Sequence, residues 1–340
     1  MKVAIGISGG VDSAVAAYLL KKQGFEVVGI TLKLKNDDDL LVEDAKAVAG
    51  AIGIEHHIID RKELFKEKVI EPFINEYKNG RTPNPCIECN QAIKFGTMLD
   101  FATELGCEKL ATGHYAKIEE NNGVYSLLKA DSPKDQSYFL YRLNQHQLSK
   151  IMLPMTDMTK EDTRALALEA GIPVAEKKDS QEICFVPNDD YISFLASLNI
   201  TAPEGNILFT DGRVAGTHKG IINYTIGQRK GIGAYGKPMF VTDINAADNT
   251  VTIGENGEQY SSGLEADRAT FILPGGLTGP LRAKVKIRFR AKEQPALITP
   301  TENGFKVLFD EPQRSVTPGQ SAVIYSENII LGGGRITNKF

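Results

Sequence analysis

Two patterns of apolar and polar residues alternate along the first half of the chain. Short, almost wholly apolar runs are separated by longer stretches in which apolar residues recur every three or four positions. The first pattern is typical of strands buried on both faces of a sheet, and the second of amphipathic helices. This alternation predicts an α/β domain with a doubly wound parallel sheet, whose ligands bind beyond the carboxyl ends of the strands. The expected strands are 3–7, 26–34, 56–60 and 109–112, and the expected helices include 40–52 and 61–77.

The pattern changes after Pro187. One more helix, 188–199, is followed by short strands and glycine-containing turns. Strand patterns at 239–254 and from 269 onward predict a small, mainly β central domain and then a β-barrel. We therefore expect three domains, with residues 1–193, 194–263 and 264–340.

The first predicted strand runs directly into a glycine turn and a helix. Gly9 and Gly10 allow a tight turn and close approach to a ligand, and Asp12 or Ser13 can cap the helix. Free N–H groups and the positive end of the helix would then face an anion. The turn has neither the lysine of a Walker A loop nor the spacing of a dinucleotide fingerprint. Its sequence, SGGVDS, resembles the signature of the N-type ATP pyrophosphatases, which implies that ATP is cleaved between its α- and β-phosphates.

Four cysteines are spread unevenly over the chain, which does not indicate a disulfide framework. Cys86 and Cys89 form C-x-x-C near the expected start of a helix, a position that lowers thiol pKa. A four-thiolate zinc site would need a second close pair, and the other two are far apart. We expect Cys107 to be a buried bystander. Cys184, between Ile and Phe, resembles a core cysteine, but sulfur chemistry commonly uses two thiols distant in sequence.

Three local signals add detail to the α/β domain. Gly113 and His114 follow the strand at 109–112, so Gly113 can let the backbone approach adenine or ribose and His114 would lie at the rim of the site. Asn-Gly at 122–123 predicts a hairpin turn. Thr159 and Asp162 have the spacing of a capping box, which predicts a helix up to Ala170.

The charge distribution separates the C-terminal region from the rest. Residues 264–340 hold 11 Lys and Arg against 7 Asp and Glu, in a chain whose net charge is −4. Six basic residues occupy alternate positions from Arg282 to Lys292, so on a strand they would share one face. Six like charges repel one another unless a polyanion lies over them, which favours RNA as the partner. A solvated strand face is the alternative.

No apolar run is long enough to span a bilayer, and the N-terminal strand lacks the layout of a signal peptide. We therefore expect a cytoplasmic protein with no membrane partner.

Seven stretches, spread over almost the full chain, resemble one family, the tRNA-specific 2-thiouridylases. They are GISGGVDS, GRTPNPCIECNQAIKF, ATGHYA, KDQSYFL, SQEICF, YTIGQRKGIG and LGGGRI. The resemblance implies ATP-dependent replacement of the 2-oxygen of the wobble uridine by sulfur. It also implies that 1–193 is the catalytic domain, that the central domain and the barrel contact tRNA, and that MgATP is used.

The same resemblance assigns roles to residues. Cys89 would be the nucleophile and Cys184 would carry a persulfide, with a disulfide between them as an intermediate. The residues implied to hold ATP are Gly6, Ile7, Ser8, Gly9, Gly10, Val11, Asp12, Ser13, Leu32 and Gly113. Those implied to meet the target base or the rest of the tRNA are Asn84, Pro85, Cys86, His114, Lys134, Asp135, Gln136, Arg288, Phe289 and Gln320. A cysteine desulfurase or a sulfur-relay protein would supply the sulfur.

Two departures from the family keep an alternative open. Many members carry an acidic residue where this chain has Cys86, and Met where it has Leu32. Leu preserves an apolar wall, but no carboxylate role can be transferred to Cys86. Cys86, Cys89 and Cys184 could instead hold an iron-sulfur cluster with an open fourth position. Two other classes compete: a small-molecule adenylating ligase, which leaves the cysteines unexplained, and a non-catalytic RNA-binding module, which leaves SGGVDS unexplained.

Overall fold

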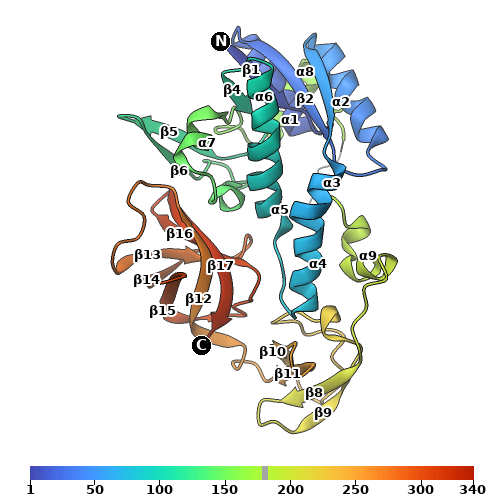
Figure 1. Ribbon diagram of the computed structural model, residues 1–340, viewed down its shortest axis with the longest axis vertical. Coiled ribbons are helices and arrows are strands. Elements are labelled where there is room, and N and C mark those ends of the chain that lie inside the picture. Colours follow the sequence, from blue (N-terminus) through green and yellow to red (C-terminus); the bar gives the residue numbers. More distant parts are fainter. Residues whose placement is uncertain (178–182) are drawn as a thin grey trace.

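The computed structural model describes residues 1–177 and 183–340 (Figure 1). Its N-terminal domain is built on a parallel sheet of five strands in the order β3-β2-β1-β4-β7. This confirms the α/β fold that the alternating pattern predicts. The strands are β1 (Lys2–Gly6), β2 (Glu26–Lys33), β3 (Glu55–Asp60), β4 (Lys109–Ala111) and β7 (Ile151–Met152).

Helices cover both faces of this sheet, and the alternation of side chains along β1 shows how. Val3 and Ile5 pack against α1 (Val11–Lys22), α2 (Asp39–Ile52) and α8 (Lys160–Glu169). Ala4, between them in sequence, faces α6 (Met98–Glu104) on the opposite side. Because successive side chains of a strand point to opposite faces, a wholly apolar strand is what a doubly covered sheet requires.

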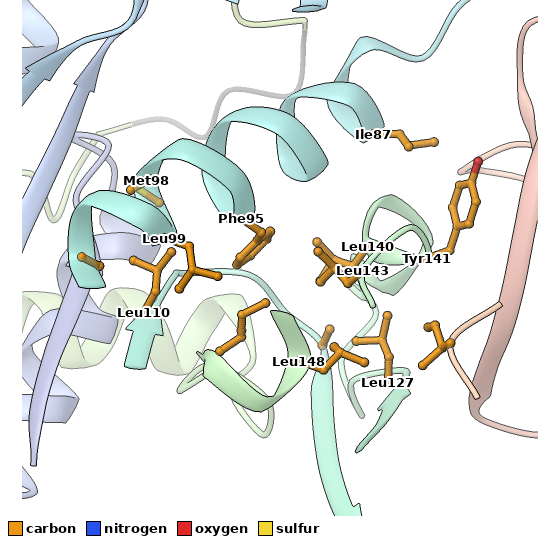
Figure 2. Packing of buried hydrophobic residues seen from close by; sticks show 14 of the residues in the cluster. Ile87, Phe95, Met98, Leu99, Leu110, Leu127, Leu140, Tyr141, Leu143 and Leu148 are labelled. Carbon is orange, nitrogen blue, oxygen red and sulfur yellow. The ribbon is translucent and has the colours of Figure 1, made fainter. Parts of the chain in front are cut away.

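Two helical stacks extend from the sheet toward the other domains (Figure 1). The first is formed by α3 (Lys62–Phe65), the π-helical η1 (Lys66–Ile70) and α4 (Glu71–Lys78), which confirms the helix expected at 61–77. The second is formed by α5 (Pro85–Glu88), the π-helical η2 (Cys89–Thr97) and α6. Figure 2 shows Phe95, Met98 and Leu99 of this second stack pointing into a core that also contains Leu140 and Leu148. Those two residues lie in η3 (Ser137–Leu140) and α7 (Gln145–Lys150).

A hairpin joins the α/β domain to the C-terminal barrel. Its strands are β5 (Lys117–Asn121) and β6 (Val124–Leu128), and Asn122 and Gly123 both have positive φ, as the Asn-Gly signal predicts. Leu127 and Leu128 pair with Ile330 and Ile329 of β17 (Ile329–Lys339), so the hairpin extends the barrel sheet. The sequence pattern predicts the hairpin but not this pairing between domains.

The rest of the chain is mainly β, as expected. After η4 (Pro187–Asp189) and α9 (Tyr191–Ser197), a four-stranded sheet follows, with a short η5 (Ile221–Asn223) between its second and third strands. Its strands are β8 (Gly205–Phe209), β9 (Val214–His218), β10 (Phe240–Asn245) and β11 (Thr250–Gly254). Val241 and Val251 share a core with Phe65 and Phe73, so this sheet packs on the first helical stack. The domain boundaries that we expect remain predictions.

Six antiparallel strands form the C-terminal barrel, which closes through pairing of β12 with β17. They are β12 (Tyr260–Phe271), β13 (Leu281–Lys286), β14 (Gln294–Thr301), β15 (Gly304–Arg314), β16 (Ser321–Ser326) and β17 (Ile329–Lys339). Among the residues that the structure describes, no helix is both long enough and apolar enough to cross a membrane.

Candidate functional site

The glycine turn lies at the carboxyl edge of the sheet, between β1 and α1. The N–H of Ser8 donates to the hydroxyl of Ser13 (3.1 Å), which in turn donates to the carbonyl of Gly10 (3.0 Å). Gly9 has φ of +65°, and a Cβ there would lie 2.9 Å from the carbonyl oxygen of Leu41 in α2. Only glycine suits both conditions.

The start of α1 differs from our expectation. Its N-cap is Gly10, and within residues 1–177 and 183–340 no side chain caps the helix, so the prediction that Asp12 or Ser13 does so is wrong. Each side chain is engaged elsewhere, Ser13 within the turn and Asp12 with residues of other segments. Because no side chain of the described residues takes up the first N–H groups of α1, these groups can bind an anion at the turn.

Two lysines from later in the chain contact this turn. The ammonium of Lys160 lies 2.6 Å from both carboxylate oxygens of Asp12. The hydroxyl of Tyr115 donates to the same carboxylate (2.8 Å). Lys177 donates to the carbonyl of Gly9 (2.9 Å) and pairs with Asp44 of α2 (2.5 Å). The turn is therefore surrounded by paired charges.

Gly113 packs directly against the turn. A Cβ at this position would lie 2.7 Å from the backbone nitrogen of Ser13 and 2.8 Å from the carbonyl carbon of Asp12. We expected Gly113 to let the backbone approach a nucleotide. The structure shows a close approach of Gly113 to the start of α1, and its approach to a nucleotide stays a prediction. Leu32 of β2 is half-buried, between the two cores that flank this end of the sheet.

His114 is buried, 8% exposed, and so does not lie at the rim of the site as we expected. Its Nδ1 lies 2.8 Å from the hydroxyl of Thr112, and its ring packs against Phe95, with centroids 5.7 Å apart. Burial, with a smaller effect from the cation of Lys94, lowers the pKa of His114 well below its usual value. The imidazole is therefore neutral at physiological pH.

Cys86 and Cys89 lie at the start of the second helical stack, where Asn84 is the N-cap of α5 and Pro85 its first residue. Cys89 is 8% exposed and Cys86 is half-buried. Burial raises the pKa of Cys89 to about 12 and also raises that of Cys86. Our expectation that the helix N-terminus lowers these pKa values is wrong, because desolvation disfavours the thiolate more strongly here.

Cys184 is brought near this pair by the fold. The residue is exposed, although enough protein surrounds its thiol to raise the pKa. Cys184 adds to the increase in pKa at both Cys86 and Cys89, and the cation of Lys94 counteracts the increase at all three thiols. The three cysteines and Lys94 therefore form one electrostatic cluster. The three cysteines are free thiols. Cys107 is also a free thiol, and it is buried in a hydrophobic core, which confirms that expectation.

The backbone before Asn84 is held by the barrel. The N–H of Thr82 donates to the carbonyl of Pro318 (2.9 Å), and the side-chain amide of Gln320 donates to the carbonyls of Thr82 (2.9 Å) and Pro83 (3.3 Å). Gln320, which we expect to meet tRNA, thus binds the segment that leads into Asn84, Pro85 and Cys86.

The segment 134–136 lies beside His114. Gln136 exchanges backbone and side-chain hydrogen bonds with the backbone of Tyr115 (2.7 and 3.1 Å). The carboxylate of Asp135 accepts from the N–H groups of Ala130 and Ser137, and burial raises its pKa. Lys134 is half-buried. Asp135 and Gln136 thus stabilise the local chain conformation, as does the N–H of Lys134, which donates to the hydroxyl of Ser132 (3.3 Å).

The basic strand is shorter than its sequence pattern suggests. β13 ends at Lys286, so the prediction that all six basic residues share one strand face is wrong. Arg288 lies in the following turn, where its guanidinium donates to the carbonyl of Ser315 and burial lowers its pKa. Phe289 packs on Phe139, with centroids 4.4 Å apart. The alternation continues past the strand because the turn also buries apolar side chains, among them Ile287.

A cavity of about 380 Å³ lies where the central domain meets the barrel. Its lining includes Arg288, Lys292 and Arg314, together with Ile226 and Gly227 of the central domain. Three cations around one cavity form a site suited to a phosphate. Arg229 and Lys230, nearby in the sequence, are exposed.

The fold and the site define a nucleotide-binding α/β domain joined to two β domains. Family models match in three segments: a tRNA methyl transferase HUP domain at 1–188, a tRNA methyl transferase PRC-barrel domain at 192–255, and an aminomethyltransferase β-barrel domain at 261–336.

Curated relatives match over almost their full length. The tRNA-specific 2-thiouridylase MnmA of Clostridioides difficile is 49% identical, with 98% of each chain covered. That of Clostridium acetobutylicum is 47% identical, with 98% of this chain and 99% of the relative covered. This chain therefore belongs to the family of tRNA-specific 2-thiouridylases, which are ATP-using enzymes of tRNA modification.

Solved structures match less closely. The U34-tRNA thiolase NcsA of Methanococcus maripaludis, solved with its 4Fe-4S cluster, is 19% identical at a TM-score of 0.37, covering 58% of this chain and 67% of NcsA. The NMN synthetase of Francisella tularensis is 21% identical at a TM-score of 0.33, covering 53% and 66%.

Three lysines at these sites were not singled out by sequence reasoning. Lys94 lies within the same motif as the cysteine pair, and Lys160 follows the capping threonine directly. Lys177 precedes the motif of Cys184, of which residues 180–182 lie outside the described part of the chain. Their positions within or next to these motifs could have pointed to them, but only the fold shows which groups they contact.

Proposed function

We propose that this protein replaces the 2-oxygen of the wobble uridine of tRNA by sulfur, at the expense of ATP, in the cytoplasm. One observation carries the sulfur chemistry: the exposed Cys184 lies near Cys89, although the two are far apart in sequence. The uncapped start of α1 at the glycine turn supports the use of ATP.

The first step is adenylation. MgATP binds at Gly6 to Ser13, with Leu32 and Gly113 beside it. The uridine O2 attacks the α-phosphorus, a new P–O bond forms, the bond to the β-phosphate breaks, and pyrophosphate leaves. The N–H groups at the start of α1 stabilise the departing anion. The product is an O2-adenylated uridine, in which AMP is a good leaving group.

The second step transfers sulfur. The terminal sulfur of a persulfide on Cys184 bonds to C2 of the uridine. The thiolate of Cys89 then attacks Sγ of Cys184, and the electron pair of the broken S–S bond passes to the sulfur on C2 as AMP leaves. In a variant of this route, Cys89 first releases the sulfur as sulfide, which attacks C2. Both routes leave a Cys89–Cys184 disulfide, which an external dithiol must reduce, and a cysteine desulfurase or sulfur-relay protein supplies the next sulfur.

The high pKa of Cys89 places a condition on this step. At neutral pH its thiol is protonated, so the proton must leave before attack. Lys94, whose charge lowers the pKa of the thiols, favours that loss. Cys86, one helical turn before Cys89, is half-buried, its pKa is also raised by burial, and it offers no carboxylate in place of the acidic residue common in the family.

An iron-sulfur route finds less support. Within residues 1–177 and 183–340, no three His, Cys, Asp or Glu side chains are gathered closely enough to hold a metal ion, so the positions of Cys86, Cys89 and Cys184 give this alternative no support.

The tRNA would lie across all three domains. Its target base would meet Asn84, Pro85 and Cys86, with His114 and 134–136 beside them. Its backbone would follow the cationic cavity at Arg288, where Phe289 and Gln320 lie toward the α/β domain. These segments are far apart in the sequence but in contact in the fold, since Gln320 bonds Thr82 and Phe289 packs on Phe139. Those contacts support one continuous surface for tRNA.

The test uses Cys89→Ser and Cys184→Ser, with Cys107→Ser as the control thiol. Full-length variants are given tRNA, ATP and a sulfur donor, and pyrophosphate release and nucleoside mass are measured. Both site variants should release pyrophosphate but form no 2-thiouridine, while the control forms it normally. Full thiolation by either site variant would overturn the persulfide route. A mass increase of a methyl group instead would favour methyl transfer, which the descriptions of two family models mention.

A further inference from the structure

The glycine turn contains no lysine of its own, yet two ammonium groups lie against it. Lys160 contacts both carboxylate oxygens of Asp12, and Lys177 contacts the carbonyl of Gly9. In the sequence, Gly9 and Asp12 bracket Gly10 and Val11, where the turn passes into α1. The two cations therefore flank the anion site that the free N–H groups of α1 define.

The fold holds Lys160 in a position that helix electrostatics disfavour. Thr159 caps α8 through a capping box, which makes Lys160 its first residue. A cation there lies at the positive end of the helix dipole and gains nothing from it. The lysine is nevertheless 15% exposed, with its ammonium 5.3 Å from the ring centroid of Tyr115, whose hydroxyl also bonds Asp12. A partly buried cation that is held in place at an unfavourable helix end indicates a role beyond the stability of α8.

Lys177 approaches from the other side. Its side chain is 42% exposed, so it can move, and it pairs with Asp44 of α2 as well as with Gly9. Both carboxylates, Asp12 and Asp44, neutralise the lysines while no nucleotide is bound. A triphosphate would offer the same ammonium groups oxygens of higher charge at the same place.

We propose that Lys160 and Lys177 bind the β- and γ-phosphates of ATP and the pyrophosphate that leaves during adenylation. The two lysines exchange part of their contact with Asp12 and with Gly9 for phosphate oxygens. They thereby supply the positive charge that a Walker A loop obtains from its own lysine. This inference rests on the proposed nucleotide site at the glycine turn.

The test is binding of ATP, AMP and inorganic pyrophosphate to the full-length protein by calorimetry. Lys160→Met and Lys177→Met should each lower the affinity for ATP and for pyrophosphate about 10- to 100-fold, as expected for losing a hydrogen bond between charged groups. The affinity for AMP should stay within about 2-fold of the wild-type value. Lys160→Arg and Lys177→Arg should retain most of the affinity. Lys46→Met is the control, because Lys46 lies on the exposed side of α2 and pairs only with Glu43 among the described residues.

A second set of variants excludes a merely structural role. If Lys160 only neutralises Asp12, then Asp12→Asn combined with Lys160→Met should bind pyrophosphate as well as Asp12→Asn alone, which would overturn the inference. On our inference the double variant stays about 10-fold weaker. Equal weakening of ATP and AMP would also overturn it. Wild-type protein that binds no ATP would instead count against the proposed function itself.

Discussion

The glycine turn and the cysteine cluster differ in the charge state of their side chains. At the turn, cations and anions lie in contact, Lys160 with Asp12 and Lys177 with Asp44. At the cluster, the thiols are neutral because burial raises their pKa, and Lys94 has no ion-pair partner among the described residues. The adenylation site is therefore charged before substrate binds, whereas the sulfur site acquires its charge only during reaction.

The difference also concerns how each region is assembled. The turn is formed by neighbouring residues, with Ser8, Gly10 and Ser13 bonded to one another. The cluster combines the start of one helical stack with a thiol far along the chain. A change in the turn should therefore affect nucleotide chemistry alone, and a change around Lys94 should affect thiol chemistry alone.

The largest expected effect concerns the protonation of Cys89. With its pKa raised to about 12, Cys89 should react with iodoacetamide at pH 8 at least about 100-fold more slowly than a free cysteine, whose pKa is about 8.5. The rate should rise about tenfold per pH unit up to pH 11, because only the thiolate reacts. Peptide mass spectrometry follows each cysteine separately. A plateau for Cys89 near pH 8 would show that the cluster is ionised like an ordinary thiol and remove the contrast.

Gly113→Ala tests the turn. Its Cβ would lie within 3 Å of the backbone of Ser13 and Asp12, so the turn must move, and we expect tRNA-dependent pyrophosphate release to fall about 10- to 100-fold. Labelling of Cys184 should not change. Gly50→Ala is the matched control, since that glycine lies in α2 with no atom near its Cβ position, and Ala should stabilise the helix slightly. If the labelling rate of Cys184 in Gly113→Ala fell as much as pyrophosphate release, the two regions would be coupled.

The same contrast explains what the sequence could predict. The SGGVDS turn, the Asn-Gly hairpin and the capping box at Thr159 depend on residues within a few positions of one another, and each is observed. The pKa of Cys89, the end of β13 at Lys286 and the burial of His114 depend on which distant segments cover them. Local spacing predicts that a thiol lies near a helix start, where its pKa would be lowered. It does not predict the desolvation that raises the pKa more strongly.

Lys94→Met should affect thiols and leave the turn unchanged. Without this cation, the pKa of Cys86, Cys89 and Cys184 should rise further. Their alkylation at pH 8 should slow about 3- to 10-fold, because a smaller fraction of each thiol is then ionised and only the thiolate reacts. Lys94→Arg should preserve the rates. Lys35→Met is a selective control, because Lys35 lowers the pKa of Cys184 but not that of the other two. ATP affinity should be the same in all three variants, and a change in it for Lys94→Met would contradict the separation.

The smallest effect is expected at Thr159, whose hydroxyl accepts from the N–H of Asp162 (3.1 Å) at the start of α8. Thr159→Ala should destabilise that helix by about 1 kcal/mol. Because α8 carries Lys160, ATP affinity should fall by no more than about 5-fold. Asn144 caps α7 with the same capping box, away from the turn, and Asn144→Ala should cost similar stability with no loss of ATP affinity. Hydrogen exchange locates each loss, and calorimetry measures ATP. If both variants lower ATP affinity equally, the nucleotide site depends on the stability of the whole domain and not on the placement of Lys160. The glycine turn would then depend on distant segments as much as the cysteine cluster does.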